Sequence, residues 1–577
     1  MIDKKKNDAL EAEQTYKTAV ESANDYIENF DILETITNVG NDEVFTPRKT
    51  CDMMLDSLPD EVWHNPNYRW LNPATKNGIF EREIAIRLDE GLKDVIPDQE
   101  KRRKHILQNM IHAIGQTKFT ANVARRTLYY CSSANRACDG ILAEDGHYVN
   151  GYAIGNGTWF ADEEGNIKTP CTDHEFVDSA GRRMPSTCKG EERKKYKCKY
   201  CGISGVSNYN DANQREKYAY ELIHINHLII GKHMSNRFFG GNKDMKFDII
   251  IGNPPYQLND GGAQASAKPI YQLFVDQAKA LNPHYLCMII PSRWMAGGKG
   301  LDDFRASMLK DRHIRVLHDY TDAKECFPNN EIKGGVCYFL WNGKEEGKCK
   351  IYKHTDGTIS TSTRYLKEDG VDVFIRDERL IEILNKVKAK KFKSFMDIVS
   401  PRKPFGLAGD FFKDPKKYDL PPISDKKIEG GITICGLDEH LQRVKRYVPQ
   451  DYPLPKKTYL HGYKMFMARN QGSGTFGEPF SVPMFAYDNE ICTETFIVIG
   501  TFKTEQEMKN CYSYIKTKFF RALVGIRKLD QNASQSIYEY APLLDFTKPW
   551  NDKELYAMFG LSDDDIKFIE ENVQEMN

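Results

Sequence analysis

The spacing of apolar and polar positions divides the chain into stretches of different character. Between residues 43 and 130, and again from residue 247, short apolar and β-branched runs alternate with segments whose apolar positions recur at helical spacing. Strands alternating with helices predict a mostly parallel sheet covered on both faces. We therefore expect an α/β core, with strands at 285–291, 314–320 and 336–341 and helices at 270–281 and 302–310.

Three segments interrupt this rhythm, and 577 residues exceed the length of one ordinary domain. Residues 1–42 have a polar helical pattern and predict an N-terminal helical arm. Residues 131–240 are rich in Gly, Asn, Asp and Cys, so we expect an insertion within a catalytic domain spanning 43–395. Residues 396–577 contain many prolines and aromatic residues and predict a separate, loop-rich domain that closes with helical patterns at 504–526 and 552–573.

Composition excludes several classes of protein. No apolar run reaches the roughly 18–20 residues that span a bilayer, and the N-terminus lacks an apolar signal region, so we expect a cytoplasmic protein with no membrane partner. The formal net charge of -1 argues against coating DNA by bulk charge, but a local basic face is still compatible with a nucleic-acid partner. The basic run at 385–393 is either a solvated helix face or a phosphate contact.

The most informative motif is Asn253-Pro254-Pro255-Tyr256, which directly follows a strand predicted at 247–252. Proline has no N–H, so the carbonyls here are free to face a ligand. The amide of Asn253 can donate and accept hydrogen bonds, and Tyr256 offers a flat ring. Such a pocket suits an enzyme that methylates the exocyclic nitrogen of a flipped-out adenine.

A second motif is the loop Asn72–Phe80, between a strand predicted at 68–71 and a helix. Gly78 allows the backbone to approach a ligand, and the amides that open the helix can face a carboxylate. Strand, small-residue turn and helix open a nucleotide-binding α/β unit. Alone the loop is a weak signal, because an ordinary strand-to-helix turn has the same composition.

Four segments follow one another in a meaningful order: Thr46-Pro47, the Asn72–Phe80 loop, Asn253–Tyr256, and Glu325-Cys326-Phe327-Pro328. This order resembles the gamma class (TaqI-like) of adenine-N6 DNA methyltransferases, and in particular the large methylases of restriction–modification systems. The resemblance covers most of the chain from Glu43 onward and is weakest in the insertion and in residues 400–460. It implies a doubly wound, Rossmann-like sheet of the kind that serves S-adenosylmethionine-dependent methyltransferases, with a Cys-rich insertion and a C-terminal α+β target-recognition domain.

The resemblance also implies roles for single residues. Thr46 caps the S-adenosylmethionine site, and four loop residues match the family pattern. Two positions depart from it, because Asn72 replaces the usual acid of the loop and Gln116 stands where an acid normally holds the ribose. The implied cofactor contacts are Thr46, Asn72, Pro73, Ala74, Gly78, Phe80 and Gln116.

In the base pocket, the resemblance implies that Asn253 and the Pro254 carbonyl accept the adenine N6 hydrogens, and that Tyr256 stacks on the base. Phe327 matches the second aromatic residue of the family, which packs edge-on, although a core phenylalanine is a close alternative. The predicted catalytic set is Asn253, Pro254, Pro255, Tyr256 and Phe327.

A Cys-x-x-Cys knuckle in the insertion, Cys198 and Cys201, is half of a common zinc site. We predict that Cys131 and His174 complete a structural site that holds an insert with little core of its own. Reduced cysteines without a metal are a serious alternative.

The sequence therefore predicts a DNA adenine-N6 methyltransferase that acts on double-stranded DNA, with a cognate restriction nuclease or helicase subunit as a further partner. Polar C-terminal stretches suit base and phosphate contacts, and we assign these to Arg469, Arg527 and Lys528. The alternatives are an enzyme that also cuts DNA, a catalytically weak DNA-binding subunit that keeps only the fold, and a methylase of protein or RNA amines.

Overall fold

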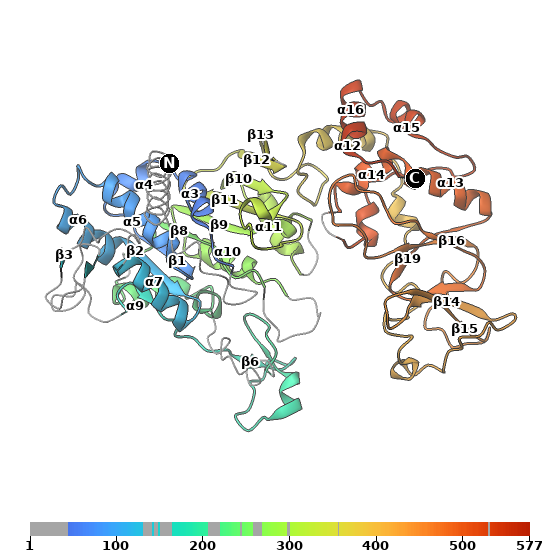
Figure 1. Ribbon diagram of the computed structural model, residues 1–577, viewed down its shortest axis with the longest axis horizontal. Coiled ribbons are helices and arrows are strands. Elements are labelled where there is room, and N and C mark those ends of the chain that lie inside the picture. Colours follow the sequence, from blue (N-terminus) through green and yellow to red (C-terminus); the bar gives the residue numbers. More distant parts are fainter. Residues whose placement is uncertain are drawn as a thin grey trace, which may run out of the picture.

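A computed structural model describes residues 44–130, 164–205, 220–242, 245–257, 268–296, 300–355, 357–528 and 531–576, with the backbone of two short strands, β3 (Ile141–Leu142) and β4 (Tyr148–Val149). Two lobes are visible in Figure 1, one built on a large sheet and one formed by the C-terminal part of the chain. Among the described residues, no helix is long and apolar enough to cross a membrane.

A nine-stranded mixed sheet forms the centre of the first lobe, in the order β13-β12-β10-β11-β9-β8-β1-β2-β5. Its strands are β1 (Trp70–Thr75), β2 (Ile111–Gly115), β5 (Ile167–Lys168), β8 (Ile249–Gly252), β9 (Tyr285–Pro291), β10 (Ile314–Tyr320), β11 (Val336–Asn342), β12 (Cys349–Thr355) and β13 (Thr358–Arg364). The run from β5 to β9 is parallel, whereas β11 lies antiparallel between β9 and β10, and β13 is antiparallel to β12. The predicted α/β class is confirmed, with a sheet that is mixed.

Helices cover both faces of this sheet because its strands are apolar on both sides. Trp70, Ile249 and Ile251 face one buried cluster, while Leu71 and Ile250 face the other, as the two-residue period of a strand requires. The first face carries α3 (Arg48–Asp56), α4 (Glu61–His64), α5 (Ile79–Gly91) and α7 (Lys118–Tyr130), and α6 (Gln99–His105) follows α5. The second carries α9 (Ile230–Phe239), α10 (Tyr271–Ala280) and α11 (Asp302–Lys310).

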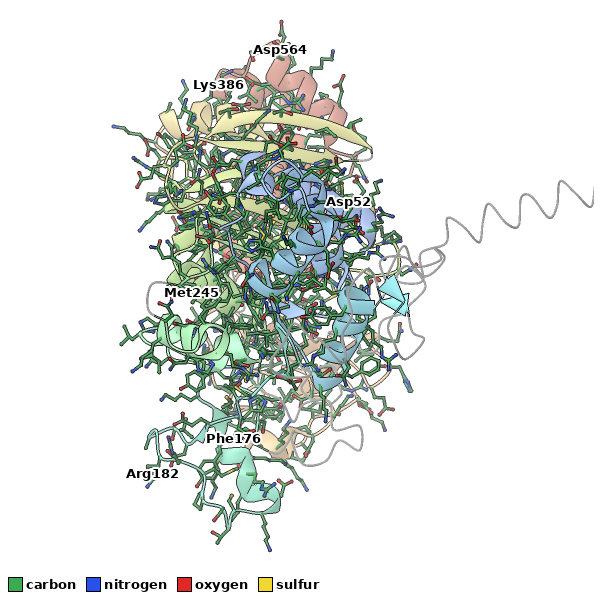
Figure 2. All side chains as sticks on the ribbon, turned by 90° about the vertical axis from the view of Figure 1, so that its left-hand side faces the viewer. Asp52, Phe176, Arg182, Met245, Lys386 and Asp564 are labelled. Carbon is green, nitrogen blue, oxygen red and sulfur yellow. The ribbon has the colours of Figure 1, made fainter. Side chains whose placement is uncertain are left out.

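The described part of the insertion has little regular structure. It contains the short pair β6 (Phe176–Val177) and β7 (Lys197–Cys198), and a 3-10 turn, η4 (Glu221–His224). Figure 1 shows β6 well away from the sheet, and Figure 2 places Phe176 and Arg182 at the far end of the lobe. Cys198, Cys201 and Ile203 at the base of this arm join the core on the second face of the sheet, whereas most of residues 178–195 are exposed.

The C-terminal lobe combines two small sheets with a helical cluster. Its elements are α12 (Glu378–Ala389), β14 (Ile432–Leu437), β15 (Arg443–Val448), β16 (Tyr463–Ala468), β17 (Met484–Ala486), β18 (Glu490–Cys492), β19 (Phe496–Phe502), α13 (Glu505–Lys516), α14 (Lys518–Gly525), α15 (Asp552–Phe559) and α16 (Asp563–Asn572). The buried face of α12 joins the core of this lobe, and Lys386 of α12 forms an ion pair with Asp565 of α16. Helix α12, which precedes the expected boundary at 395, therefore packs with the C-terminal lobe.

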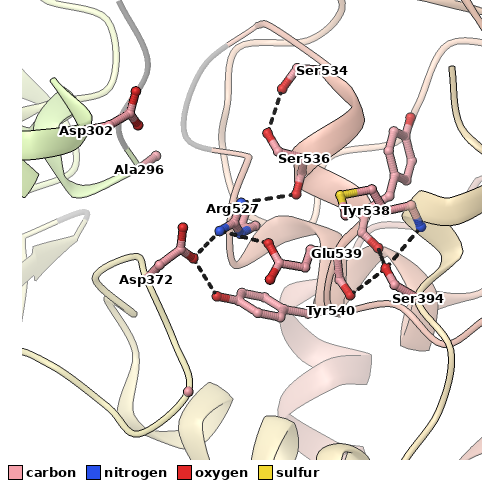
Figure 3. Close-up of polar contacts among 12 residues, drawn as sticks. Ala296, Asp302, Asp372, Ser394, Arg527, Ser534, Ser536, Tyr538, Glu539 and Tyr540 are labelled. Atoms are coloured by element: carbon pink, nitrogen blue, oxygen red, sulfur yellow. Dashed lines mark hydrogen bonds and ion pairs between the residues drawn. The ribbon is translucent and has the colours of Figure 1, made fainter. Parts of the chain in front are cut away.

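Asp372 links the two lobes through three partners, of which Figure 3 shows Arg527 and Tyr540. It forms an ion pair with Arg527, accepts a hydrogen bond from the Tyr540 hydroxyl at 3.0 Å, and lies 3.3 Å from the guanidinium of Arg305 on α11. Arg527 also pairs with Glu539 at 2.9 Å. These contacts hold the pKa of the Asp372 carboxyl below its usual value, although burial opposes them.

Candidate active site

The site lies where β1 and β8 end side by side. The two strands pair through Trp70 with Ile249 and Leu71 with Ile250. Successive strands of the chain lie on opposite sides of this pair, β2 beyond β1 and β9 beyond β8, so the strand order reverses there. In open α/β sheets, ligands bind outside the carboxyl ends of the strands at such a switch point. The two motifs singled out from the sequence are the segments that end these two strands.

Glycines allow the two segments to approach each other closely. A Cβ atom on Gly252, at the end of β8, would lie 2.5 Å from Oδ1 of Asn72 on β1. Gly78 has a φ of 81°, which favours glycine, and a Cβ there would lie 2.9 Å from the backbone of Ala124 on α7. The loop is fixed on the same side by Thr127, whose hydroxyl donates to the Asn77 carbonyl at 2.6 Å.

The side-chain amide of Asn253 has one engaged end and one free end. Nδ2 donates to the Val44 carbonyl at 3.2 Å and to Thr46 Oγ1 at 3.1 Å. Oδ1 is buried and receives no hydrogen bond from the described residues. Asn253 therefore presents an unused acceptor, which is the chemistry required to hold an amino group.

Residues 44–47 form a strap that closes the site. Besides Asn253, the ammonium of Lys76 donates to the Val44 carbonyl at 2.6 Å. The cavity left behind the strap is about 10 Å³, room for about one water molecule. Its lining consists of Thr46, Asn72, Ala74, Thr75, Lys76, Asn77, Gly78, Ile79, Phe80, Glu81 and Asn253. This volume is smaller than a ligand of nucleotide size.

Polar atoms without partners converge on this cavity. They include Thr75 Oγ1, Asn77 Nδ2, both carboxylate oxygens of Glu81 and Asn253 Oδ1, none of which meets a partner within the described part of the chain. Nε2 of Gln116, one strand away, is in the same state. Buried polar groups in folded proteins are nearly always hydrogen-bonded. Their concentration in one place fits a polar ligand such as a nucleoside carrying an amino acid.

Tyr256 and Phe327 meet edge to face beside this cavity. Their ring centroids are 6.5 Å apart, with an interplanar angle of 79°. Phe327 is 1% exposed and belongs to the core on one face of the sheet, whereas Tyr256 packs against the core on the other face. Burial raises the pKa of the Tyr256 phenol well above its usual value, which keeps the ring neutral.

The structure brings together most residues that the sequence assigned to the cofactor. Thr46, Asn72, Ala74, Gly78 and Phe80 line one cavity, and Pro73 lies between two of them on β1. Gln116 lies beyond the cavity lining, at the end of β2, where its backbone N–H donates to the Thr75 carbonyl at 3.2 Å. Sequence reasoning missed Thr75, Lys76, Asn77 and Glu81. Glu81 could have been noticed in the sequence because it directly follows Phe80 of the loop motif. It places a carboxylate among the buried residues in the first turn of α5.

A second cluster lies at the base of the insertion. The ligand atoms of His174, Cys198, Cys201 and His224 all lie within 4.8 Å of one another. Cys131 lies outside the described residues, and the fourth position is taken by His224 of η4, which the sequence analysis missed. The hydrogen bond with Cys201 lowers the pKa of the Cys198 thiol. This donor set matches the ligands that zinc prefers.

Cys171, Glu221 and His233 form a neighbouring group of possible metal ligands. Its carboxylate is already paired with protein side chains, His233 and Arg237. Glu221 accepts a hydrogen bond from His233 Nε2 at 2.8 Å and lies 3.5 Å from the Arg237 guanidinium. These partners hold the pKa of the Glu221 carboxyl below its usual value despite its burial. This group is therefore an ion-pair network that anchors η4 to α9.

Two of the three residues expected to contact DNA are engaged within the chain. The Arg527 side chain is 9% exposed and pairs with Asp372 and Glu539 (Figure 3). Lys528 is 4% exposed and pairs with Glu478. Arg469 is partly exposed, and burial lowers the pKa of its guanidinium. Phosphate contacts by Arg527 or Lys528 would require buried ion pairs to break.

These observations define a class: an α/β protein with a nucleotide-type site at the switch point of its sheet and a pocket for an amino group beside it. Known proteins agree with that class. The model of the Eco57I restriction-modification methylase matches residues 109–327. An uncharacterized adenine-specific methylase of Mycoplasma pneumoniae is 46% identical over 330 residues, which cover 56% of this chain and 72% of the relative. The chain belongs to the family of adenine-specific methylases.

Similar solved structures include restriction–modification enzymes. A nuclease-deletion mutant of the Type ISP enzyme LlaGI with a DNA substrate mimic has a TM-score of 0.47 at 10% identity, covering 92% of this chain and 47% of that one. The DrdV–DNA complex has a TM-score of 0.44 at 12% identity, covering 87% and 56%. The Type IIL enzyme MmeI with DNA has a TM-score of 0.43 at 13% identity, covering 88% and 68%. This chain spans about half the length of the first two.

Proposed function

We propose that the protein is a DNA adenine-N6 methyltransferase that uses S-adenosylmethionine and modifies double-stranded DNA within a restriction–modification system. The observation that carries the proposal is the unused, buried acceptor Oδ1 of Asn253 beside Tyr256, next to a cavity with several unpartnered polar atoms. Membership of the adenine-specific methylase family supports the same substrate.

In the proposed mechanism, Asn253 Oδ1 and the Pro254 carbonyl accept the two hydrogens of the adenine amino group. This holds the nitrogen lone pair in one direction, and Tyr256 holds the plane of the base by stacking. The cofactor, when bound, supplies a methyl group on a positively charged sulfur. Thr46, Asn72 and Gly78 would hold the cofactor so that its methyl group could pass to the adenine nitrogen, and the proton displaced from that nitrogen would leave to water. Positioning and electrostatics, not a strong base, carry such a step.

The test is a methylation assay with purified protein, S-adenosylmethionine and unmethylated DNA. We expect N6-methyladenine from the wild type and loss of at least about 100-fold in rate for Asn253→Ala and Tyr256→Ala, as for other removed transition-state contacts. Asn236→Ala, an exposed asparagine on α9, is the matched control and keeps the wild-type rate. Wild-type rates in both site variants would rule out the proposed site.

We propose that the C-terminal part, residues 396–577, recognises the DNA target. Because Arg527 and Lys528 are buried in ion pairs, better candidates for phosphate contacts are exposed lysines near the β14–β15 sheet. These are Lys426, Lys427, Lys456 and Lys457. The match to a restriction-modification methylase supports a cognate nuclease or helicase subunit as the protein partner.

We propose that the cluster of His174, Cys198, Cys201 and His224 holds a structural zinc ion. Four ligands of these types complete a closed tetrahedral site without an open position for catalysis. Three of the four are mostly or fully buried, and the surrounding arm has little core. The ion would therefore join the base of β6 and β7 to η4 and stabilise the insertion.

A catalytically weak DNA-binding subunit is the second candidate, favoured by the amides at positions 72 and 116 and by the closed strap. Titration with S-adenosylmethionine separates the two, since only the enzyme requires the cofactor to bind.

A further inference from the structure

We propose that Glu81 supplies the carboxylate that pairs with the positive charge of the cofactor, replacing the acid absent at position 72. This inference rests on the proposed function. It gives the cofactor site a charged partner at a position where the family resemblance does not place one.

The surroundings of Glu81 are unusual for a carboxylate. This residue is 1% exposed. Among the described residues that line the cavity, Glu81 is the one that carries a carboxylate. Neither oxygen meets the geometry of a hydrogen bond or an ion pair within the described part of the chain, although the side chains of Thr75 and Asn72 lie close to the carboxylate. Burying an unpaired charge is costly, and proteins normally pair or neutralise such a group. A cationic ligand that enters this cavity would supply the missing partner.

The position of Glu81 in the fold suits that role. It lies in the first turn of α5, where the positive end of the helix dipole favours a carboxylate. The side chains of Thr75 and Asn72, from the end of β1, are near enough to favour its charged form. Helix α5 thus carries the acid to the same cavity that the end of β1 lines.

No titratable group in the described part of the chain forms an ion pair with Glu81. Cys51 of α3 and Tyr129 of α7 face it, and burial raises the pKa of both, so they stay neutral near pH 7. Lys76 lines the same cavity and donates to the Val44 carbonyl of the strap. Burial raises the pKa of Glu81 itself to about 7. Cation binding therefore favours the ionised carboxylate and releases a proton from the protonated fraction.

Two positive groups of S-adenosylmethionine are candidate partners, the sulfonium and the α-ammonium. They are distinguished by S-adenosylhomocysteine, which keeps the ammonium and lacks the sulfonium charge. If the ammonium is the partner, both ligands lose affinity to the same extent when Glu81 is neutralised. If the sulfonium is the partner, only S-adenosylmethionine does so.

The experiment is isothermal titration calorimetry of S-adenosylmethionine at pH 6.0 and 7.5, in buffers of different ionisation enthalpy. From a ligand-free pKa of about 7, the ionised fraction of Glu81 rises about eightfold between these values, so the affinity should rise by up to about eightfold with proton release. Glu81→Gln should bind S-adenosylmethionine at least about tenfold more weakly and should lose the proton release of Glu81. Any proton release that remains in this variant comes from the ligand's own amine and is subtracted from the wild-type value. Glu90→Gln, an exposed acid on the same helix, is the control and behaves as the wild type.

A double variant guards against a purely structural effect. Adding Asn72→Asp to Glu81→Gln returns the acid to the position usual in the family and should recover most of the affinity. The inference is overturned if Glu81→Gln binds S-adenosylmethionine as tightly as the wild type with the same pH dependence, an outcome that leaves the proposed function intact. No binding by the wild type would instead overturn the proposed function, and this inference with it.

Discussion

Neutralising Glu81 should stabilise the ligand-free protein, although it weakens cofactor binding. Burial raises the pKa of this carboxyl from 4.5 to about 7. The difference between a pKa of 4.5 and one of about 7 corresponds to about 3 kcal/mol, which the charged form costs the folded state. Because the folded pKa is raised, the stabilising contribution of the protonated acid is complete below pH 4.5 and is lost as pH rises through 7.

Glu81→Gln removes this dependence. We compare the unfolding free energy of the variant with that of the wild type, and take their difference below pH 4.5 as the reference. From that reference, the difference should shift in favour of the variant by up to about 3 kcal/mol at pH 8, but by less than about 1 kcal/mol at pH 5. Chemical denaturation followed by tryptophan fluorescence suits the measurement, because the tryptophans at 63, 70, 294 and 341 all lie in the sheet lobe. Saturating S-adenosylmethionine should reverse the order at pH 8, since binding stabilises the folded wild type more.

Two results would refute this reasoning. One is a variant that is less stable than the wild type at pH 8, which would mean that the carboxylate has a stabilising partner in the ligand-free protein. The other is a difference in unfolding free energy that stays constant from pH 5 to pH 8, which would mean that Glu81 does not titrate in this range. Glu90→Gln provides the baseline, because that side chain is exposed.

Two further predictions concern the zinc cluster and the contact between the strand ends. His224→Ala should reduce the zinc content of purified protein, measured by elemental mass spectrometry, from about one ion per chain to well below one. Cys188→Ala, which changes a buried cysteine outside the cluster, should retain the ion. A full zinc content in His224→Ala would remove that residue from the ligand set. Gly252→Ala places a Cβ 2.5 Å from Asn72 Oδ1, so it should destabilise the sheet lobe by about 1–3 kcal/mol and weaken cofactor binding. Unchanged stability together with unchanged binding would show that the strand ends have room to separate.

Local patterns in the sequence predicted much of the central sheet. The strands at 285–291 and 314–320 and the helix at 302–310 have the expected limits, because apolar runs and helical spacing are properties of neighbouring residues. The helical pattern at 504–526 is instead two helices, since Thr517 takes an extended conformation and caps α14. Similarly, Gly560 has a φ of 65° and ends α15, which divides the pattern at 552–573.

The rest of the site depends on residues distant in the sequence. His224 joins Cys198 through the placement of η4, and no spacing rule links them. The position of Glu81 directly after Phe80 is a local signal, but its unpaired state follows from the packing of α3 and α7 against α5. Arg527 and Lys528 were assigned from polar composition alone, which does not distinguish a free cation from one that a distant carboxylate neutralises.

The central claim is that the pocket built on Asn253 and Tyr256 methylates adenine in DNA. Its most direct test is long-read detection of modified bases in DNA from a host lacking adenine methylation that expresses this chain, compared with the same host expressing Asn253→Ala. The account predicts N6-methyladenine at one defined sequence in the first DNA and none in the second. Unmodified DNA in both hosts, from a chain that is folded and binds S-adenosylmethionine, would contradict it, as would equal modification in both.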